Sequence, residues 1–203
     1  MNRMCRAGTG AAVVVTVLCG TALAADPSEH KKACLPGQQK AAEKALADAK
    51  SGVQQAIASL KAPSQTDVKR LQKWFGSLGS DTAGNVQNVY ASALGSAVFS
   101  QFWCPVSNDL SFKWGQGDLA AVDKADPSSI FLTPDFFKLK LTGADSQMGT
   151  VIHELTHLAG VGLKDEVYGT SEAKALALTN ASKARNNSDN FQYYVEDLLF
   201  TVP

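Results

Sequence analysis

The sequence predicts a single α+β domain with N-terminal helices, a small mixed sheet and a helix that carries a metal-binding pattern. Three observations support this class. Apolar residues recur at helical spacing between residues 41 and 94. Short aromatic and β-branched runs, bounded by proline, glycine or asparagine, follow between residues 98 and 133. Helical patterns then return, and helices, a sheet and further helices in that order are typical of an α+β domain.

Residues 1–24 are predicted to be a secretory signal peptide, and residues 25–203 the functional domain. Basic residues precede an apolar run at residues 11–18, and small residues allow cleavage after Ala24 or Ala25. The apolar run is too short to cross a membrane. We therefore expect an exported protein, secreted or periplasmic, without a membrane anchor.

The charge of the mature chain argues against nucleic acid or an anionic membrane as a partner. The whole sequence has 19 basic and 19 acidic residues, so removal of Arg3 and Arg6 leaves a formal charge of −2. The remaining length is enough for one domain with its own core. We expect this domain to be a monomer.

Two of the four cysteines remain after the signal peptide is removed, Cys34 and Cys104. In an exported chain the simplest prediction is one disulfide between them. Closing a loop of this size would stabilise the fold by roughly 4 kcal/mol. The alternative is that both cysteines are free or bind a metal, which two isolated cysteines do poorly.

The N-terminal part predicts three helices. The first follows Pro36 and has small apolar residues on one face over residues 41–60, with charged residues on the other. The second begins within residues 63–67 and ends at Gly76, and the third follows Asp81. Strands are predicted at residues 98–104, 110–114 and 130–133. Further along, residues 171–184 are predicted to be helical and residues 186–190 a loop.

The most informative pattern is His153-Glu154-Leu155-Thr156-His157, an H-E-x-x-H within an apolar segment. On a helix, residues four apart lie on one face, so both imidazoles can bind one cation. The glutamate then lies beside the metal, where it can take a proton from a metal-bound water. The alternative is a pair of histidines on a core helix that are satisfied by carboxylates or by the backbone.

A catalytic zinc needs a third protein ligand. The remaining histidine, His30, falls in the expected mobile N-terminus, and Leu163 stands where the extended metzincin pattern requires a third histidine. The third ligand is therefore expected to be a carboxylate. The nearby candidates are Asp165, Glu166 and Glu172.

The stretch at residues 162–169 resembles the G-T-x-D-x-x-Y-G motif of the aspzincin family, which comprises deuterolysins and peptidyl-lysine metalloendopeptidases. Residues 74–76, 143–150 and 187–194 also resemble family segments, and the two mature cysteines fall about where members carry a disulfide. Leu163 replaces the usual threonine, and the spacing from His157 is one residue short. The resemblance implies a zincin-like fold and one Zn²⁺ per chain, bound by His153, His157 and Asp165.

The resemblance also implies an activity, which is zinc-dependent cleavage of polypeptides within the chain. Glu154 would act as the general base, and Tyr168 would donate a hydrogen bond to the oxyanion. The alternative for Tyr168 is a packed tyrosine near a turn. Two alternatives for the whole protein stay open: a catalytically silent zinc-binding protein with the same fold, and a zinc amidase that acts on a non-protein amide. A partner inhibitor is also conceivable, although no residue indicates one.

Lysine-specific members of the family place two acids at the S1′ pocket, at positions matched here by Asp189 and Gln192. Asp189 agrees with that pattern, whereas Gln192 replaces the usual glutamate. A buried carboxylate could still select lysine on the carboxyl side of the cut, because a desolvated ammonium needs a partner. The alternative for Asp189 is an ordinary loop or helix-cap aspartate.

Overall fold

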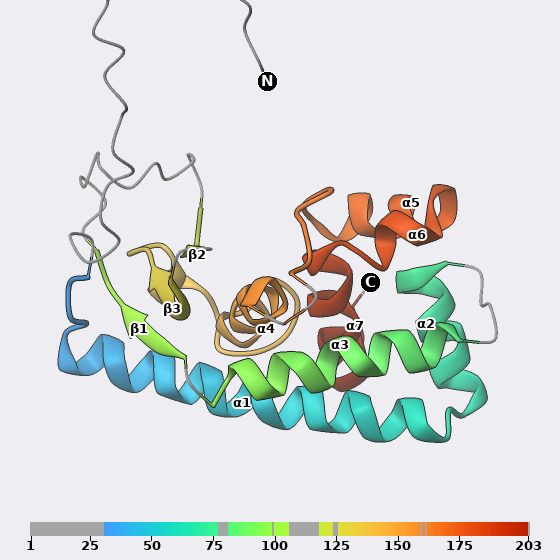
Figure 1. Ribbon diagram of the computed structural model, residues 1–203, viewed down its shortest axis with the longest axis horizontal. Coiled ribbons are helices and arrows are strands. Elements are labelled where there is room, and N and C mark those ends of the chain that lie inside the picture. Colours follow the sequence, from blue (N-terminus) through green and yellow to red (C-terminus); the bar gives the residue numbers. More distant parts are fainter. Residues whose placement is uncertain are drawn as a thin grey trace, which may run out of the picture.

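The computed structural model describes residues 31–76, 81–98, 100–105, 118–123, 126–158, 160 and 162–202. The predicted signal peptide, His30 and the predicted strand at residues 110–114 lie outside the described residues. Within them, helices surround one central helix, with a small sheet on one side (Figure 1).

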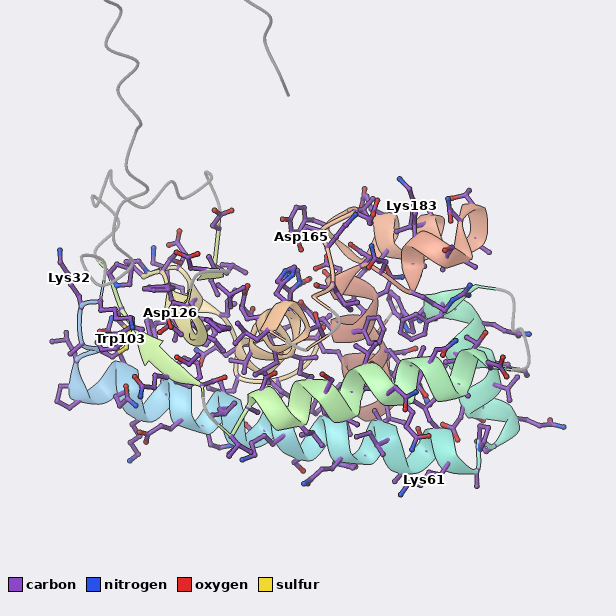
Figure 2. All side chains as sticks on the ribbon, viewed as in Figure 1. Lys32, Lys61, Trp103, Asp126, Asp165 and Lys183 are labelled. Carbon is purple, nitrogen blue, oxygen red and sulfur yellow. A yellow bond between two sulfur atoms is a disulfide. The ribbon has the colours of Figure 1, made fainter. Side chains whose placement is uncertain are left out.

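The three predicted N-terminal helices are present as α1 (Pro36–Lys61), α2 (Gln65–Phe75) and α3 (Thr82–Ser96). Helix α1 buries a face of small residues, so α3, α4 and α7 pack closely against it. Its opposite face is charged, and Lys61 points away from the molecule (Figure 2). Gly76 ends α2 as predicted, with a φ of 77° that favours glycine.

The predicted mixed sheet is confirmed. It consists of β1 (Gln101–Trp103), β2 (Ala120–Asp123) and β3 (Asp126–Leu132) in the order β1-β3-β2. Strand β1 runs parallel to β3, and β2 runs antiparallel to it. Strand β2 was not predicted, because its four half-buried residues contain only one β-branched side chain.

The C-terminal part contains α4 (Gln147–Leu158), α5 (Thr170–Thr179), α6 (Ala181–Ala184) and α7 (Ser188–Phe200), and a single 3-10 turn at Phe136–Lys138 precedes α4. The prediction that residues 171–184 are helical is confirmed except at Asn180, where the helical segment divides in two. The helix breaks at Asn180, whose side chain accepts a hydrogen bond from the backbone of Lys183 and starts α6. The loop predicted at residues 186–190 was wrong in its second half, since α7 already begins there.

Helix α4 lies at the centre of the core. Its buried apolar side chains pack against α1, α3 and α7, and its remaining side faces β2 and β3. In Figure 1 it is seen nearly end-on, between the sheet and the α5–α6 region. Side chains on this side of α4 therefore face the region between the sheet and the C-terminal segments.

The predicted disulfide is formed between Cys34 and Cys104. It joins the residues before α1 to the residue after β1, and the backbone N–H of Cys104 also donates to the carbonyl of Lys32 at 2.8 Å. The sheet edge is thereby fixed to the start of the helical layer. Among the described residues, none of the helices has the length and apolar character required to cross a bilayer.

Candidate metal centre

The H-E-x-x-H pattern lies on α4, as predicted, and the start of this helix is held by polar groups. The Ser146 hydroxyl accepts a hydrogen bond from the backbone N–H of Gly149, and the Glu196 carboxylate accepts from the backbone N–H of Ser146. Glycine is required at position 149, because a Cβ there would collide with Glu196 Oε1. The helix that presents both histidines therefore begins at a fixed point.

Three candidate ligand atoms form a nearly equilateral triangle. His153 Nε2 and His157 Nε2 are 3.1 Å apart, and each is 3.0 Å from Asp165 Oδ1. Two ligands of a tetrahedral zinc, at bond lengths near 2.0 Å, lie about 3.3 Å apart. The structure thus brings together the three residues that the family resemblance implied, at a spacing close to that of a zinc site.

The hydrogen-bond partner of Nδ1 fixes the tautomer of each imidazole. His157 Nδ1 lies 2.8 Å from the carbonyl of Leu163, which can only accept, so this nitrogen carries the hydrogen. His153 Nδ1 likewise lies 2.7 Å from Asp189 Oδ1. In the neutral rings both Nε2 atoms then present lone pairs toward Asp165, an arrangement typical of metal-binding histidines.

Three acceptors at this distance repel one another unless a positive charge lies between them. Burial acts to lower the pKa of His153, yet the carboxylates of Asp165 and Asp189 outweigh it and raise the pKa to about 10. The site therefore attracts a positive charge, either a proton or a metal ion. The donor set, two imidazoles and one carboxylate, is one that zinc accepts.

Asp165 is the carboxylate that meets the histidines, among the three candidates from the sequence. Glu166 points elsewhere and forms an ion pair of 3.1 Å with Lys183. Glu172 lies in the first turn of α5, close to Gly169, and is not part of the triangle.

Glu154 and Tyr168 line the same cavity as this triangle. Glu154 is 5% exposed, and burial raises the pKa of its carboxyl group while the neighbouring imidazoles oppose the rise. The Tyr168 ring stacks on the His153 imidazole, with centroids 6.2 Å apart and planes 16° from parallel. Burial and the charge of Asp165 raise the pKa of the Tyr168 phenol, so the group stays protonated.

Asp189 and Gln192 come from the first turns of α7 and line the same cavity. Both oxygens of Asp189 are engaged, one with His153 and the other with the backbone N–H of Gly169 at 2.6 Å. Gln192 is buried, and its amide nitrogen lies 3.5 Å from Glu196 Oε2.

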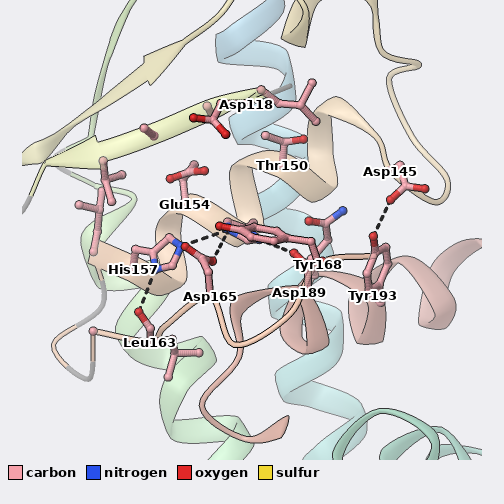
Figure 3. A pocket seen from close by; sticks show the side chains of 18 of the residues that line it. Asp118, Asp145, Thr150, Glu154, His157, Leu163, Asp165, Tyr168, Asp189 and Tyr193 are labelled. Atoms are coloured by element: carbon pink, nitrogen blue, oxygen red, sulfur yellow. Dashed lines mark hydrogen bonds and ion pairs between the residues drawn. The ribbon is translucent and has the colours of Figure 1, made fainter. Parts of the chain in front are cut away.

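The cavity has a volume of about 890 Å³ and contains all seven predicted metal, catalytic and substrate-binding residues (Figure 3). Lining residues that the sequence did not indicate include Asp118 and Asp145. Asp145 accepts a hydrogen bond of 2.6 Å from the Tyr193 hydroxyl, at the end of the cavity away from His157. The cavity lining contains acids and histidines but, within the described residues, no lysine or arginine.

A sequence model of the aspzincin family, described as lysine-specific metallo-endopeptidase, matches residues 60–196. The chain belongs to the aspzincin family. An extracellular protease of Aeromonas hydrophila is 32% identical over 160 residues, which are 78% of this chain and 44% of that protein. A peptidyl-Lys metalloendopeptidase of Grifola frondosa is 31% identical over 183 residues, which are 85% of this chain and 49% of the relative.

A solved zinc peptidase structure supports the fold. The zinc peptidase from Grifola frondosa superimposes with a TM-score of 0.69 at 30% sequence identity, over 81% of this chain and 98% of that chain. The predicted α+β class is therefore confirmed. This aspzincin chain spans about half the length of these two relatives.

Proposed function

We propose that this aspzincin is a zinc-dependent endopeptidase. The observation that carries the proposal is the convergence of His153, His157 and Asp165 beside the buried carboxylate of Glu154. These groups open onto a cavity large enough to take several residues of an extended peptide. Relatives that carry protease and metalloendopeptidase names support the same activity.

His153, His157 and Asp165 would hold the zinc, which when bound lowers the pKa of a water molecule and polarises the scissile carbonyl. The chain's own contribution here is orientation. The Leu163 carbonyl and the Asp189 carboxylate hold the two imidazoles with their Nε2 lone pairs facing inward.

Glu154 acts as the general base and then as the general acid. It follows His153 on α4, so its carboxylate lies next to the triangle without being part of it. It takes a proton from the attacking water and passes it to the leaving amine. Burial favours this role, because burial raises the pKa of Glu154 toward the pKa values of the attacking water and the leaving amine.

Tyr168 donates a hydrogen bond to the oxyanion that develops during attack. Its ring is held against His153, yet the residue is 65% exposed and so accessible to a bound peptide. A phenol with a raised pKa keeps its hydrogen at neutral pH and can serve as a donor.

For the substrate, we propose a preference for lysine immediately after the cut. Asp189, Gln192 and Asp145 line the cavity on the side of α7, and two of them are acidic. Two peptidyl-Lys relatives support the same preference. Because Gln192 is neutral and Asp189 is engaged by His153, we expect this preference to be weaker than one set by two free carboxylates.

We further propose that the protein acts outside the cytoplasm, with residues 1–24 as its signal peptide. The disulfide between Cys34 and Cys104 is stable in oxidising compartments. A relative named as an extracellular protease supports the same location.

Digestion of an unfolded protein by the mature chain tests the activity, with Glu154→Gln as the control. The variant keeps the side-chain size and the three candidate ligands, so it should bind zinc and cut about 10²–10⁴-fold more slowly. Mapping the cuts by mass spectrometry tests the lysine preference. Equal cutting by the variant would refute the role of Glu154, and cut sites without lysine enrichment would refute the preference.

A further inference from the structure

Asp165, unlike the two histidines, comes from a segment outside any helix or strand. It lies between Gly162 and Tyr168, in the irregular connection from α4 to α5. A ligand on such a loop is held only as well as the loop itself. The contacts on either side of Asp165 therefore decide whether its carboxylate stays within reach of the histidines.

The residue before Asp165 is held by backbone hydrogen bonds. The N–H of Lys164 donates to the carbonyl of Asn186 at 3.0 Å, and the Lys164 carbonyl accepts from the N–H of Ser188 at 3.0 Å. Together they make an isolated parallel bridge between Lys164 and Asn187. The loop thus runs alongside the start of α7 for the length of one residue pair.

The residues after Asp165 are held by one side chain. Asn187 Oδ1 accepts hydrogen bonds from the backbone N–H groups of Glu166, at 2.8 Å, and Val167, at 3.2 Å. The Asn187 side chain therefore fixes the loop after the candidate ligand, and the backbone of its two neighbours, Asn186 and Ser188, fixes the loop before it. Asn187 is fully buried, so water does not compete for these bonds.

The use of this side chain is unusual for its position. Asn187 is the N-cap residue of α7, where an asparagine normally accepts a hydrogen bond from the first turn of its own helix. Here the side chain makes no such bond. Its oxygen is directed instead to a segment 20 residues away in sequence.

Asn187 is itself held in a defined orientation. Its amide nitrogen donates to Asn190 Oδ1 at 2.7 Å, which places the oxygen toward the loop. The amide nitrogen of Asn190 donates in turn to the carbonyls of Trp74 and Ala173, on α2 and α5. The loop is thereby connected, through two buried asparagines, to the helical core.

We infer that Asn187 is a positioning residue for the metal centre, because it holds the loop that presents Asp165 to His153 and His157. The inference rests on the proposed zinc site. It assigns to Asn187 a function separate from any contact with substrate, and it makes the metal affinity depend on a residue that touches no metal.

The first test is amide hydrogen exchange in the metal-free protein, which needs no variant and no activity. The N–H groups of Glu166 and Val167 should exchange slowly, as buried and hydrogen-bonded amides do. Exchange as fast as that of an unstructured loop would overturn the inference, even if the protein binds zinc and cuts peptides.

The second test compares Asn187→Ala with a matched control, Tyr90→Phe. The Tyr90 hydroxyl donates to the carbonyl of Phe191 on α7, so its removal also deletes one buried hydrogen bond to that helix, away from the loop. Zinc affinity, measured by competition with a chromophoric chelator, should fall about 10- to 100-fold in Asn187→Ala. It should stay within about twofold of the unmodified chain in Tyr90→Phe, since the loop that presents Asp165 keeps its hydrogen bonds to Asn187.

The outcomes separate the two proposals. Equal zinc affinity in Asn187→Ala and the unmodified chain would overturn the positioning role while leaving the peptidase intact. An equal loss of affinity in both variants would also overturn it, because general destabilisation would then explain the effect. No zinc binding by the unmodified chain would refute the proposed function, and the exchange rates would then still show whether Asn187 holds the loop around Asp165.

Discussion

At the scale of single residues, Asp189 is the position where sequence and structure assign different functions. The family resemblance implies a contact with the substrate, whereas its two oxygens bind His153 Nδ1 and the backbone of Gly169. A carboxylate behind a metal-binding histidine orients the ring and makes it a stronger ligand. The two functions predict different consequences for one substitution.

We expect Asp189→Asn to weaken zinc affinity by about 10- to 100-fold, because the amide removes the negative charge behind His153. Competition with a chelator measures this directly. If Asp189 contacted only the substrate, zinc affinity would be unchanged and only the preference for lysine would fall.

We expect Tyr168→Phe to lower kcat by about 10²–10³ while zinc content stays at one per chain, because a single oxyanion donor is lost. The ring that stacks on His153 is retained in this variant, so packing is preserved. Steady-state kinetics with a fluorogenic peptide and metal analysis of the same sample measure both quantities. An unchanged kcat would contradict the proposed role.

At the scale of elements, the start of α4 depends on a buried carboxyl group of α7. Glu196 accepts hydrogen bonds from the backbone of Asp145 and from the backbone and hydroxyl of Ser146. Burial nevertheless raises the pKa of Glu196 to about 7, from an ordinary value of 4.5. The helix that carries both histidines is thus coupled to a group that titrates near neutrality.

The sign of the resulting pH dependence follows from linkage. The folded chain holds the Glu196 proton more tightly than the unfolded chain does. The stabilisation that comes from this proton is therefore complete below pH 4.5 and is lost as the pH rises to about 7. Glutamine cannot titrate. The free energy of unfolding of the unmodified chain, relative to Glu196→Gln, should therefore fall by on the order of 3 kcal/mol over this range. Urea unfolding at several pH values and saturating zinc measures it, and a constant difference would contradict the prediction.

Elements with a strong local signal were predictable, and those defined by distant contacts were not. The faces of α1 to α3 follow from helical periodicity, and Gly76 marks the end of α2. Strand β2 has a weak local signal and exists because β3 pairs with it. The break at Asn180 was missed because a cap in the middle of a helical pattern has no periodic signature.

The residues of the candidate site also separate into those that the sequence predicted and those that it did not. His153, Glu154 and His157 are set by one helix, so their spacing in the sequence predicts their arrangement. Asp165 was identified by resemblance to a family motif, since three carboxylates were possible by spacing. The supporting contacts of Asn187 and Glu196 join segments 20 or more residues apart, and no local pattern predicts them. The Leu163 carbonyl reaches His157 from six residues away, through an irregular loop that has no periodic signal.

At the scale of the whole molecule, the disulfide joins the helical layer to the sheet across 70 residues. Removal of both cysteines, by Cys34→Ser with Cys104→Ser, should lower the free energy of unfolding by roughly 4 kcal/mol, because the unfolded chain gains freedom. Urea unfolding of the oxidised protein and the double variant measures the change. Stability that is unchanged by the double substitution would contradict the prediction.

The central claim is that one zinc, held by His153, His157 and Asp165, makes this aspzincin an endopeptidase. The most direct measurement is titration of the chelated mature chain with zinc, following both bound metal and cleavage of an unfolded protein. Cleavage should be absent without metal, rise in proportion to bound zinc, and stop rising at one zinc per chain. Cleavage that survives complete removal of the metal, or one bound zinc without any cleavage, would contradict the claim.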